Sequence, residues 1–81
     1  MTISELLAEV ARRGGDTKAI FTGVGNAEDR YAIVTSPHGW EVFYSERGQR
    51  NELRSFARES EACSYLLSLL ERDTTVWQMR G

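Results

Sequence analysis

The sequence predicts a small two-layer α+β domain, in which a helix, a three-stranded antiparallel meander and a second helix follow one another. Apolar residues recur at helical spacing near both ends of the chain, and apolar and polar residues alternate in the stretches between them. Two amphipathic helices are enough to cover one face of a small sheet. The 81 residues are short for more than one domain, so residues 1–81 are expected to fold as one unit.

The first helix is expected over residues 3–13. Thr2 and Glu5 have the spacing of a capping box, in which each side chain binds a free backbone amide at the helix start. The Gly14-Gly15 pair ends the pattern, because glycine readily takes the left-handed conformation that terminates helices. The apolar positions fall on one helical face: Ile3, Leu6, Leu7, Val10 and Ala11.

The meander is expected over residues 30–35, 40–45 and 53–56. Ser36-Pro37-His38-Gly39 has the composition of a tight turn between the first two strands. The stretch Ser45-Glu46-Arg47-Gly48 is interpreted first as the corner that ends the second strand, with Gly48 in a left-handed conformation. A short C-terminal edge strand, or a loose cover, is open for Val76 and Trp77, and residues 19–22 are open as a short strand or an ordered loop.

The second helix is expected over residues 61–72, with Ser60 as its N-cap and a start one or two residues earlier left open. Its apolar stripe faces the sheet, where Trp40 is expected to be largely buried against this helix. The residues to which the pattern assigns a structural role are Trp40, Tyr44, Gly48, Phe56, Leu66 and Leu69.

Composition favours an ordinary folded protein without a strong charge preference. The formal net charge is −2 and the charged fraction is 27%, so nothing over the whole surface attracts nucleic acid or an anionic membrane. The single cysteine, Cys63, excludes an internal disulfide. No stretch is apolar enough for a membrane span and no signal segment is recognised, so a cytoplasmic location is expected.

Catalytic and metal chemistry have weak support in the sequence, and no cofactor is expected. His38 lies in the expected turn, and Cys63 lies in the second helix as an inert, buried thiol. Two such residues cannot complete a zinc site, which needs three or four ligands. The sequence therefore favours a protein that is not an enzyme.

Four arginines near aromatic residues raise the alternative of weak nucleic-acid binding. Basic and aromatic side chains together can hold a single strand through phosphate contacts and stacking. Glutamates are interspersed among them, however, and would repel phosphates, so a self-neutralising surface is the favoured interpretation. The four arginines are Arg47, Arg50, Arg54 and Arg58.

The stretch GWEVFYSERG and the residues after it resemble a family pattern. Phe56 follows the stretch, then Glu61-Ala62-Cys63 and the apolar run Tyr65-Leu66-Leu67. The pattern is similar to that of small bacterial proteins, either uncharacterised or immunity-type partners encoded beside secreted polymorphic toxins. The resemblance covers about residues 39–73. The matching positions are Trp40, Tyr44, Ser45, Glu46, Arg47, Gly48, Phe56, Ala62 and Cys63.

The resemblance implies a cytoplasmic protein that binds a cognate toxin domain and blocks its active site without catalysing a reaction. Acidic side chains are suited to plug a basic nuclease or NAD-glycohydrolase cleft, and arginines are common at protein interfaces. A small accessory subunit that forms a homodimer through its sheet edge or the Trp77 tail is the alternative. The expected partner-binding residues are Glu28, Asp29, Glu46, Arg47, Arg50, Glu52 and Arg54.

Overall fold

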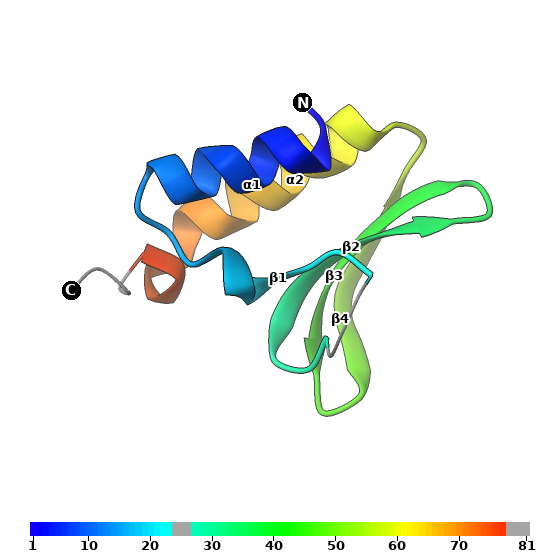
Figure 1. Cartoon of the computed structure of the whole chain (residues 1–81). Coiled ribbons are helices and arrows are strands. Elements are labelled where there is room, and N and C mark those ends of the chain that lie inside the picture. The colour runs from blue at the N-terminus through cyan, green and yellow to red at the C-terminus, as the bar shows by residue number, and fades with distance from the viewer. Residues whose placement is uncertain (24–26, 78–81) are drawn as a thin grey trace.

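The computed structural model describes residues 1–23 and 27–77, and it has two helices packed on one face of a four-stranded sheet (Figure 1). Residues 24–26 of the stretch between 16 and 29, and the tail from residue 78, lie outside the described residues. In chain order the elements are α1 (Ile3–Arg12), η1 (Thr17–Ala19), β1 (Ile20–Phe21), β2 (Arg30–Ser36), β3 (Gly39–Glu46), β4 (Gln49–Phe56), α2 (Glu59–Arg72) and η2 (Thr74–Trp77). The α+β prediction is confirmed at this level.

The sheet has the order β1-β2-β3-β4, and it is mixed rather than antiparallel throughout. The strands β2, β3 and β4 form the predicted meander, but β1 pairs in parallel with β2 through Ile20 and Phe21. The prediction of a three-stranded antiparallel sheet was therefore incomplete. The strand β1 lies within residues 19–22, which the sequence had left open as a short strand or an ordered loop. A strand of two residues contains no full period of alternation, so periodicity alone could not decide between the two.

The two hairpins have turns of two residues each. Ser36 pairs with Gly39 across the first turn, and Glu46 pairs with Gln49 across the second. The φ angles of Arg47 and Gly48 are 52° and 77°, which is the pattern of a type I′ hairpin turn. The Ser45–Gly48 corner is thus a tight turn, and β4 begins at residue 49 rather than at the predicted residue 53. Its first four residues are polar, so they gave no apolar signal.

Gly39 is required by a close approach of two backbones. Its φ of 145° is rare for residues with a side chain, and a Cβ atom at this position would collide with the Phe56 carbonyl oxygen. Trp40 pairs with Phe56 in the same ladder. The absence of a side chain at residue 39 therefore lets the last residues of β4 pair with the first residues of β3.

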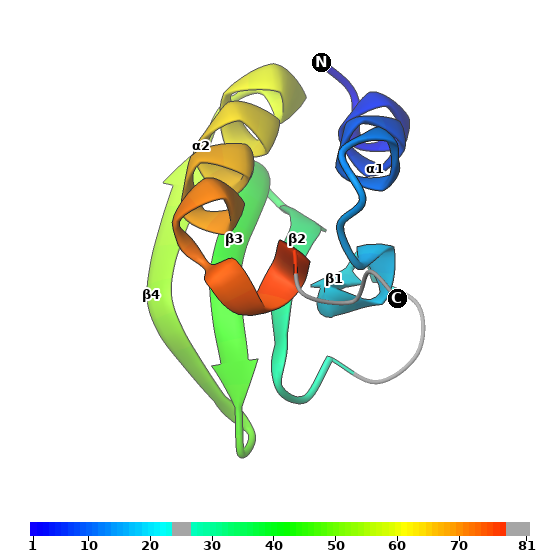
Figure 2. The ribbon, with the colours of Figure 1, turned by 90° about the vertical axis from the view of Figure 1, so that its left-hand side faces the viewer.

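The two helices run parallel and are tied together at both ends (Figures 1 and 2). The predicted capping box is present at α1, which ends at Arg12 with Arg13 as C-cap. The Glu59 carboxylate accepts a hydrogen bond of 2.8 Å from the Ile3 amide, so the start of α2 also caps α1. At the other end, Arg13 and Glu71 form an ion pair of 2.9 Å.

The predicted N-cap of the second helix was wrong. The helix begins at Glu59, which is the start two residues before position 61 that the sequence had left open, and Arg58 is the N-cap without a side-chain capping bond. Ser60 lies inside the first turn. Within that turn the Glu59 carboxylate accepts from the Ile3 amide of α1, a contact between distant residues that a local capping rule cannot reveal.

The core lies between the helices and the sheet. Its fully buried residues include Leu6 and Val10 from α1, Ile33 and Val42 from the sheet, and Leu66 from α2. The apolar residues at its margin are half-buried: Tyr31, Trp40, Phe56, Tyr65 and Leu69. Trp40 therefore packs against the core and is partly buried, which agrees in part with the expectation that it is largely buried.

The end of the described chain is a cover, not an edge strand. Val76 is buried, and the Trp77 indole Nε1 donates a hydrogen bond of 2.8 Å to the Leu70 carbonyl oxygen. A Cβ atom on Gly15 would come within 2.6 Å of the Trp77 ring, so the indole also packs closely against the chain after α1. The η2 segment thus closes the end of the core.

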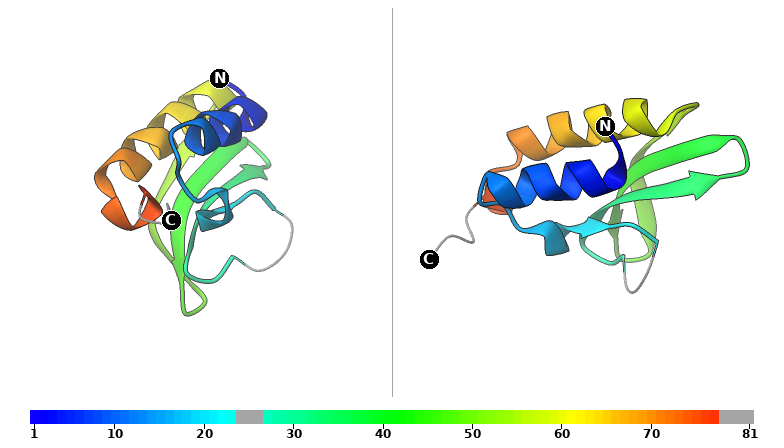
Figure 3. Two further views of the ribbon diagram at one scale, coloured as in Figure 1. Left: turned by 60° about the vertical axis from the view of Figure 1, so that its left-hand side comes forward. Right: turned by 45° about the horizontal axis from the view of Figure 1, so that its top comes forward.

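Among the described residues, no helix lies on the opposite face of the sheet (Figure 3). Phe43 is nevertheless buried there, because the Arg50 guanidinium lies 4.9 Å from its ring centre and also contacts Glu41 at 3.4 Å. Leu53, on the edge strand β4, is 43% exposed. None of the helices in the described part of the chain has the length and apolar character that crossing a membrane requires.

Substitution Gly39→Ala is expected to lower the free energy of unfolding by about 2 kcal/mol or more, because it adds both backbone strain and the collision with Phe56. Gly48→Ala is the matched control, since a Cβ atom at Gly48 meets open space and only the positive φ is unfavourable. That control is expected to cost about 1 kcal/mol. Urea unfolding measures both, and equal losses would contradict the close approach at residue 39.

Candidate functional site

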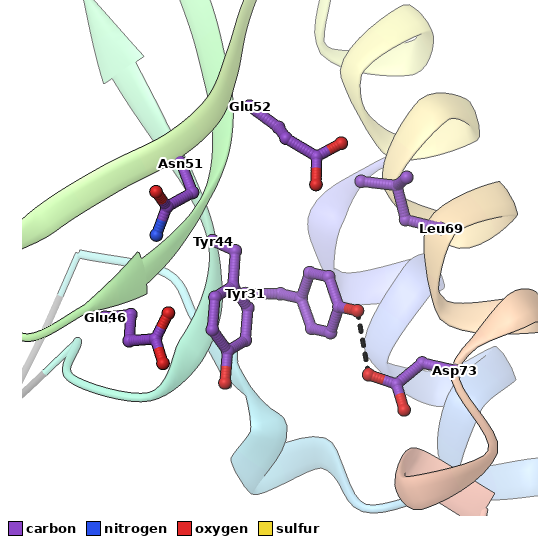
Figure 4. Close-up of a pocket in the computed structure, with 7 residues that line it drawn as sticks. All are labelled: Tyr31, Tyr44, Glu46, Asn51, Glu52, Leu69 and Asp73. Carbon is purple, nitrogen blue, oxygen red and sulfur yellow. Dashed lines mark hydrogen bonds between the residues drawn. The ribbon is translucent and has the colours of Figure 1, made fainter.

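A pocket of about 290 Å³ opens where the C-terminal end of β3 and the N-terminal half of β4 approach the C-terminal end of α2 (Figure 4). Its lining combines two aromatic rings, one aliphatic side chain, one amide and three carboxylates. The lining residues are Tyr31, Tyr44, Glu46, Asn51, Glu52, Leu69 and Asp73. We call this the tyrosine pocket.

The strand register brings the two tyrosines together. Tyr31 of β2 pairs directly with Tyr44 of β3, and both lie on the face that the helices cover. Their ring centres are 5.0 Å apart and the rings are at 70° to each other, which is the edge-to-face arrangement that aromatic pairs prefer. Leu69 approaches from α2, and Asp73 is the C-cap of that helix. With β4, which contributes Asn51 and Glu52, four elements line one small site.

A β-bulge in β4 places two consecutive residues in the pocket. Val42 pairs with Arg54 but Tyr44 pairs with Asn51, so β4 has one residue more than β3 in this interval. Glu52 takes the left-handed conformation, with a φ of 56°, where bulges often have glycine. Regular alternation would send Asn51 and Glu52 to opposite faces. The bulge lets both line the tyrosine pocket.

Tyr31 is fixed by a hydrogen bond to Asp73. Its hydroxyl donates to the Asp73 carboxylate at 2.8 Å, and Figure 4 shows it pointing toward that residue. Burial raises the pKa of Tyr31, and the Asp73 carboxylate raises it further as acceptor and as a negative charge. Tyr31 therefore remains neutral over the physiological pH range and keeps its proton in this bond.

The environment of Tyr44 shows how the carboxylates are distributed. Burial raises the pKa of Tyr44, and the negative charges of Asp29, Glu46 and Asp73 add to that effect. Asp29 is close because the next residue, Arg30, pairs with Ser45, which places Asp29 beside the end of β3. We call the set Asp29, Glu46, Glu52 and Asp73 the acidic corner.

The acidic residues predicted to bind a partner gather at this corner. Glu46 and Glu52 line the pocket, and Asp29 adds its charge beside Tyr44. Glu28 is exposed next to Asp29 but does not line the pocket. Three of the four predicted acidic residues therefore act on one site.

The predicted arginines are not brought together. Arg47 is exposed in the hairpin turn, Arg50 lies over Phe43 on the helix-free face, and Arg54 lies 5.4 Å from the Tyr65 ring centre beside α2. Arg58 is the N-cap of α2, and the ribbon shows the start of this helix far from the β3–β4 turn (Figure 1). These positions do not form a common basic surface of the kind the nucleic-acid alternative requires.

Sequence reasoning missed several residues of the site. Tyr31, Asn51 and Asp73 were not proposed, and Tyr44 and Leu69 were assigned structural roles only. The pairing of Tyr31 with Tyr44 was available in principle, because the Pro37-His38 turn fixes the register of that hairpin. The bulge that turns Glu52 into the pocket has no glycine or other local signal.

The pocket is chemically suited to a positively charged group. Within residues 1–23 and 27–77, no basic side chain lines it, and neither Glu46 nor Glu52 has an ion pair. The same residues contain no group of three His, Cys, Asp or Glu side chains that could hold a metal ion. The carboxylates and aromatic rings of the tyrosine pocket suit an organic cation, because carboxylates accept charge-assisted hydrogen bonds and aromatic faces attract cations.

The two reactive side chains considered from the sequence lie elsewhere. His38 is exposed in the β2–β3 turn. Cys63 is buried in α2, and burial raises the pKa of its thiol, with a smaller contribution from Glu59. A thiol in this environment is a weak nucleophile at neutral pH.

Comparison with known proteins found no matching family, no matching curated protein and no matching solved structure. The resemblance to toxin-immunity proteins therefore stays a prediction. The functional argument rests on the geometry and charge of the tyrosine pocket and the acidic corner.

Glu52→Gly is expected to raise the free energy of unfolding by about 0.5–1 kcal/mol, because glycine takes the left-handed conformation without the strain that a side chain adds. Glu52→Gln keeps that strain and removes only the charge, so it is expected to stay within about 0.5 kcal/mol of the wild type. Chemical denaturation of the three proteins separates the two effects. A less stable Glu52→Gly protein would contradict the strained bulge.

Tyr31→Phe is expected to flatten the loss of stability at alkaline pH. The raised pKa of Tyr31 means that the folded protein holds this proton more tightly than the unfolded chain. Its contribution is fully present below the ordinary tyrosine pKa of 10.0 and declines as the pH rises above it. The urea midpoint of the wild type should therefore fall more steeply above pH 10 than that of Tyr31→Phe. Parallel curves would contradict the raised pKa of Tyr31 in the folded protein.

Proposed function

We propose that this protein is a non-enzymatic, immunity-type module that binds a cognate toxin domain through the acidic corner and blocks its active site. The observation that carries the proposal is the concentration of carboxylates around a pocket lined by tyrosines. The resemblance of the GWEVFYSERG stretch to immunity-type proteins supports the same function.

The charge distribution supports a basic partner surface. The formal net charge of the chain is only −2, yet four carboxylates meet at one corner, while arginines elsewhere pair with Glu9, Glu41 and Glu71. Enzymes that cleave nucleic acids or dinucleotides need cationic clefts to hold phosphates. A local excess of negative charge speeds association with such a cleft and disfavours wrong partners.

The composition and rigidity of the corner also support a protein interface. Tyrosines are enriched at the centres of interfaces, because they bury a large area with little loss of conformational freedom. Tyr31 and Tyr44 stand on paired strands, and Asp73 is held by the Tyr31 hydroxyl. Side chains placed on strands and fixed by neighbours need little reorganisation on binding.

Self-association is the second candidate, and the edge strand β4 favours it. This strand has eight residues, pairs only with β3 in the described part of the chain, and exposes Leu53. The bulge at Glu52 and the charges of Arg50 and Arg54 oppose extension of the sheet, because both features are common protections of edge strands. A homodimer is therefore ranked below a heterologous complex.

The test is an affinity purification of the tagged protein with the toxin domain encoded beside it, both produced recombinantly. The variants Glu46→Lys and Glu61→Lys are tested as a matched pair. Each variant changes the charge by two units, but Glu61 lies in the first turn of α2, far from the pocket at the other end of that helix. Glu46→Lys is expected to weaken the complex at least tenfold, about 1.4 kcal/mol. Glu61→Lys is expected to leave the affinity within about threefold.

Three outcomes would contradict the proposal. Absence of a complex at micromolar concentration would refute the binding of a toxin partner. Equal weakening by the two variants would show that only the total charge matters. Elution of the protein alone as a dimer, with no heterologous complex, would favour self-association through β4.

A further inference from the structure

The size of the tyrosine pocket limits what it can hold. Its volume of about 290 Å³ is near the lower end of small-molecule sites, which begin at roughly 300 Å³, and it corresponds to roughly ten water molecules. This space accommodates the end of one long side chain or a small organic cation. A folded loop or a nucleotide would exceed it.

The acceptors of the pocket distinguish among organic cations. Glu46, Glu52 and Asn51 present oxygen acceptors at different sides of the space, and Asp73 adds a carboxylate that already accepts from Tyr31. A guanidinium group has five N–H donors in one plane, an ammonium group has three, and a quaternary ammonium group has none. Several separated acceptors are therefore best satisfied by a guanidinium group.

The aromatic rings point to the same ligand. A planar guanidinium packs against aromatic faces, and it is less strongly hydrated than an ammonium group. The protein uses this contact twice in its own fold, where Arg50 lies over Phe43 and Arg54 over Tyr65. Tyr31 and Tyr44 provide rings of the same kind in the pocket, and no arginine of the described residues lines it.

We propose that the tyrosine pocket is the specificity pocket of the interface and binds the guanidinium group of one arginine side chain of the partner protein. The guanidinium lies against the Tyr44 ring and donates hydrogen bonds to Glu46 and Glu52, whose charges it neutralises. This inference rests on the proposed function, because it names the partner group that the acidic corner receives.

The strain at Glu52 acquires a reason under this proposal. The left-handed backbone of the bulge directs the Glu52 carboxylate toward the space beside Leu69 (Figure 4). A glycine at this position would relieve the strain but supply no carboxylate. The bulge thus lowers the stability of the fold and places a carboxylate acceptor in the pocket.

The experiment is a titration of the ¹⁵N-labelled full chain with Nα-acetyl-arginine amide, with Nα-acetyl-lysine amide and tetramethylammonium chloride as matched cations at constant ionic strength. The amide shifts of Asn51, Glu52 and Leu69 report binding in the pocket. We expect the arginine derivative to bind about threefold tighter than the lysine derivative and at least about tenfold tighter than tetramethylammonium. Glu52→Gln should weaken arginine binding about tenfold, while Glu61→Gln should not change it.

Two results would overturn the pocket assignment. Equal shifts from the three cations would show only a general attraction to negative charge, and the absence of shifts at the pocket amides would show that it receives no such group. Failure here is distinguishable from failure of the proposed function. A toxin complex that tolerates Glu52→Gln would refute the arginine pocket and retain the toxin partner. Selective arginine binding without a toxin complex would retain the arginine pocket and refute the toxin partner.

Discussion

The burial of one sheet face under two parallel helices is the constraint on which the rest of this fold depends. A chain of 81 residues can bury only one modest core, and here all of the larger buried aliphatic residues belong to it. The helices hold their positions through Glu59 at one end and Arg13 with Glu71 at the other. Because α2 ends over the strand ends, its C-cap Asp73 is available to meet Tyr31, and the pocket forms at that margin of the core.

The site and the fold make different demands on the same strand. At its far end, β4 must be regular, since Phe56 pairs with Trp40 and packs against Tyr65. Near the turn it is irregular, and the bulge moves Glu52 out of the regular alternation. The stability of the core does not require an acidic residue in a left-handed conformation there. We infer that the irregular half of β4 serves binding and the regular half serves folding.

The sequence was sufficient for features that depend on neighbouring residues. The capping box at Thr2, the Pro37-His38 turn and the amphipathic stripe of α2 could all be predicted, because each arises from local geometry. Features that depend on distant contacts could not. The contact of Glu59 with α1 joins residues that are distant in sequence, and the acidic corner depends on the strand register and on an unsignalled bulge. Glu46 and Glu52 were nevertheless proposed as binding residues from their charge alone, whereas Asp73 needed the structure.

The contact between Ile3 and Glu59 has a consequence for the order of folding. It joins residues 56 positions apart in the chain, whereas β2, β3, β4 and α2 follow one another through short connections and contact their neighbours in sequence. Closing a long loop costs more entropy than forming a hairpin. The segment from residue 30 to residue 73 can therefore organise before α1 docks, and it already contains every residue that lines the tyrosine pocket. The surface proposed for recognition therefore lies within the segment that can organise first, and α1 closes the core when it docks.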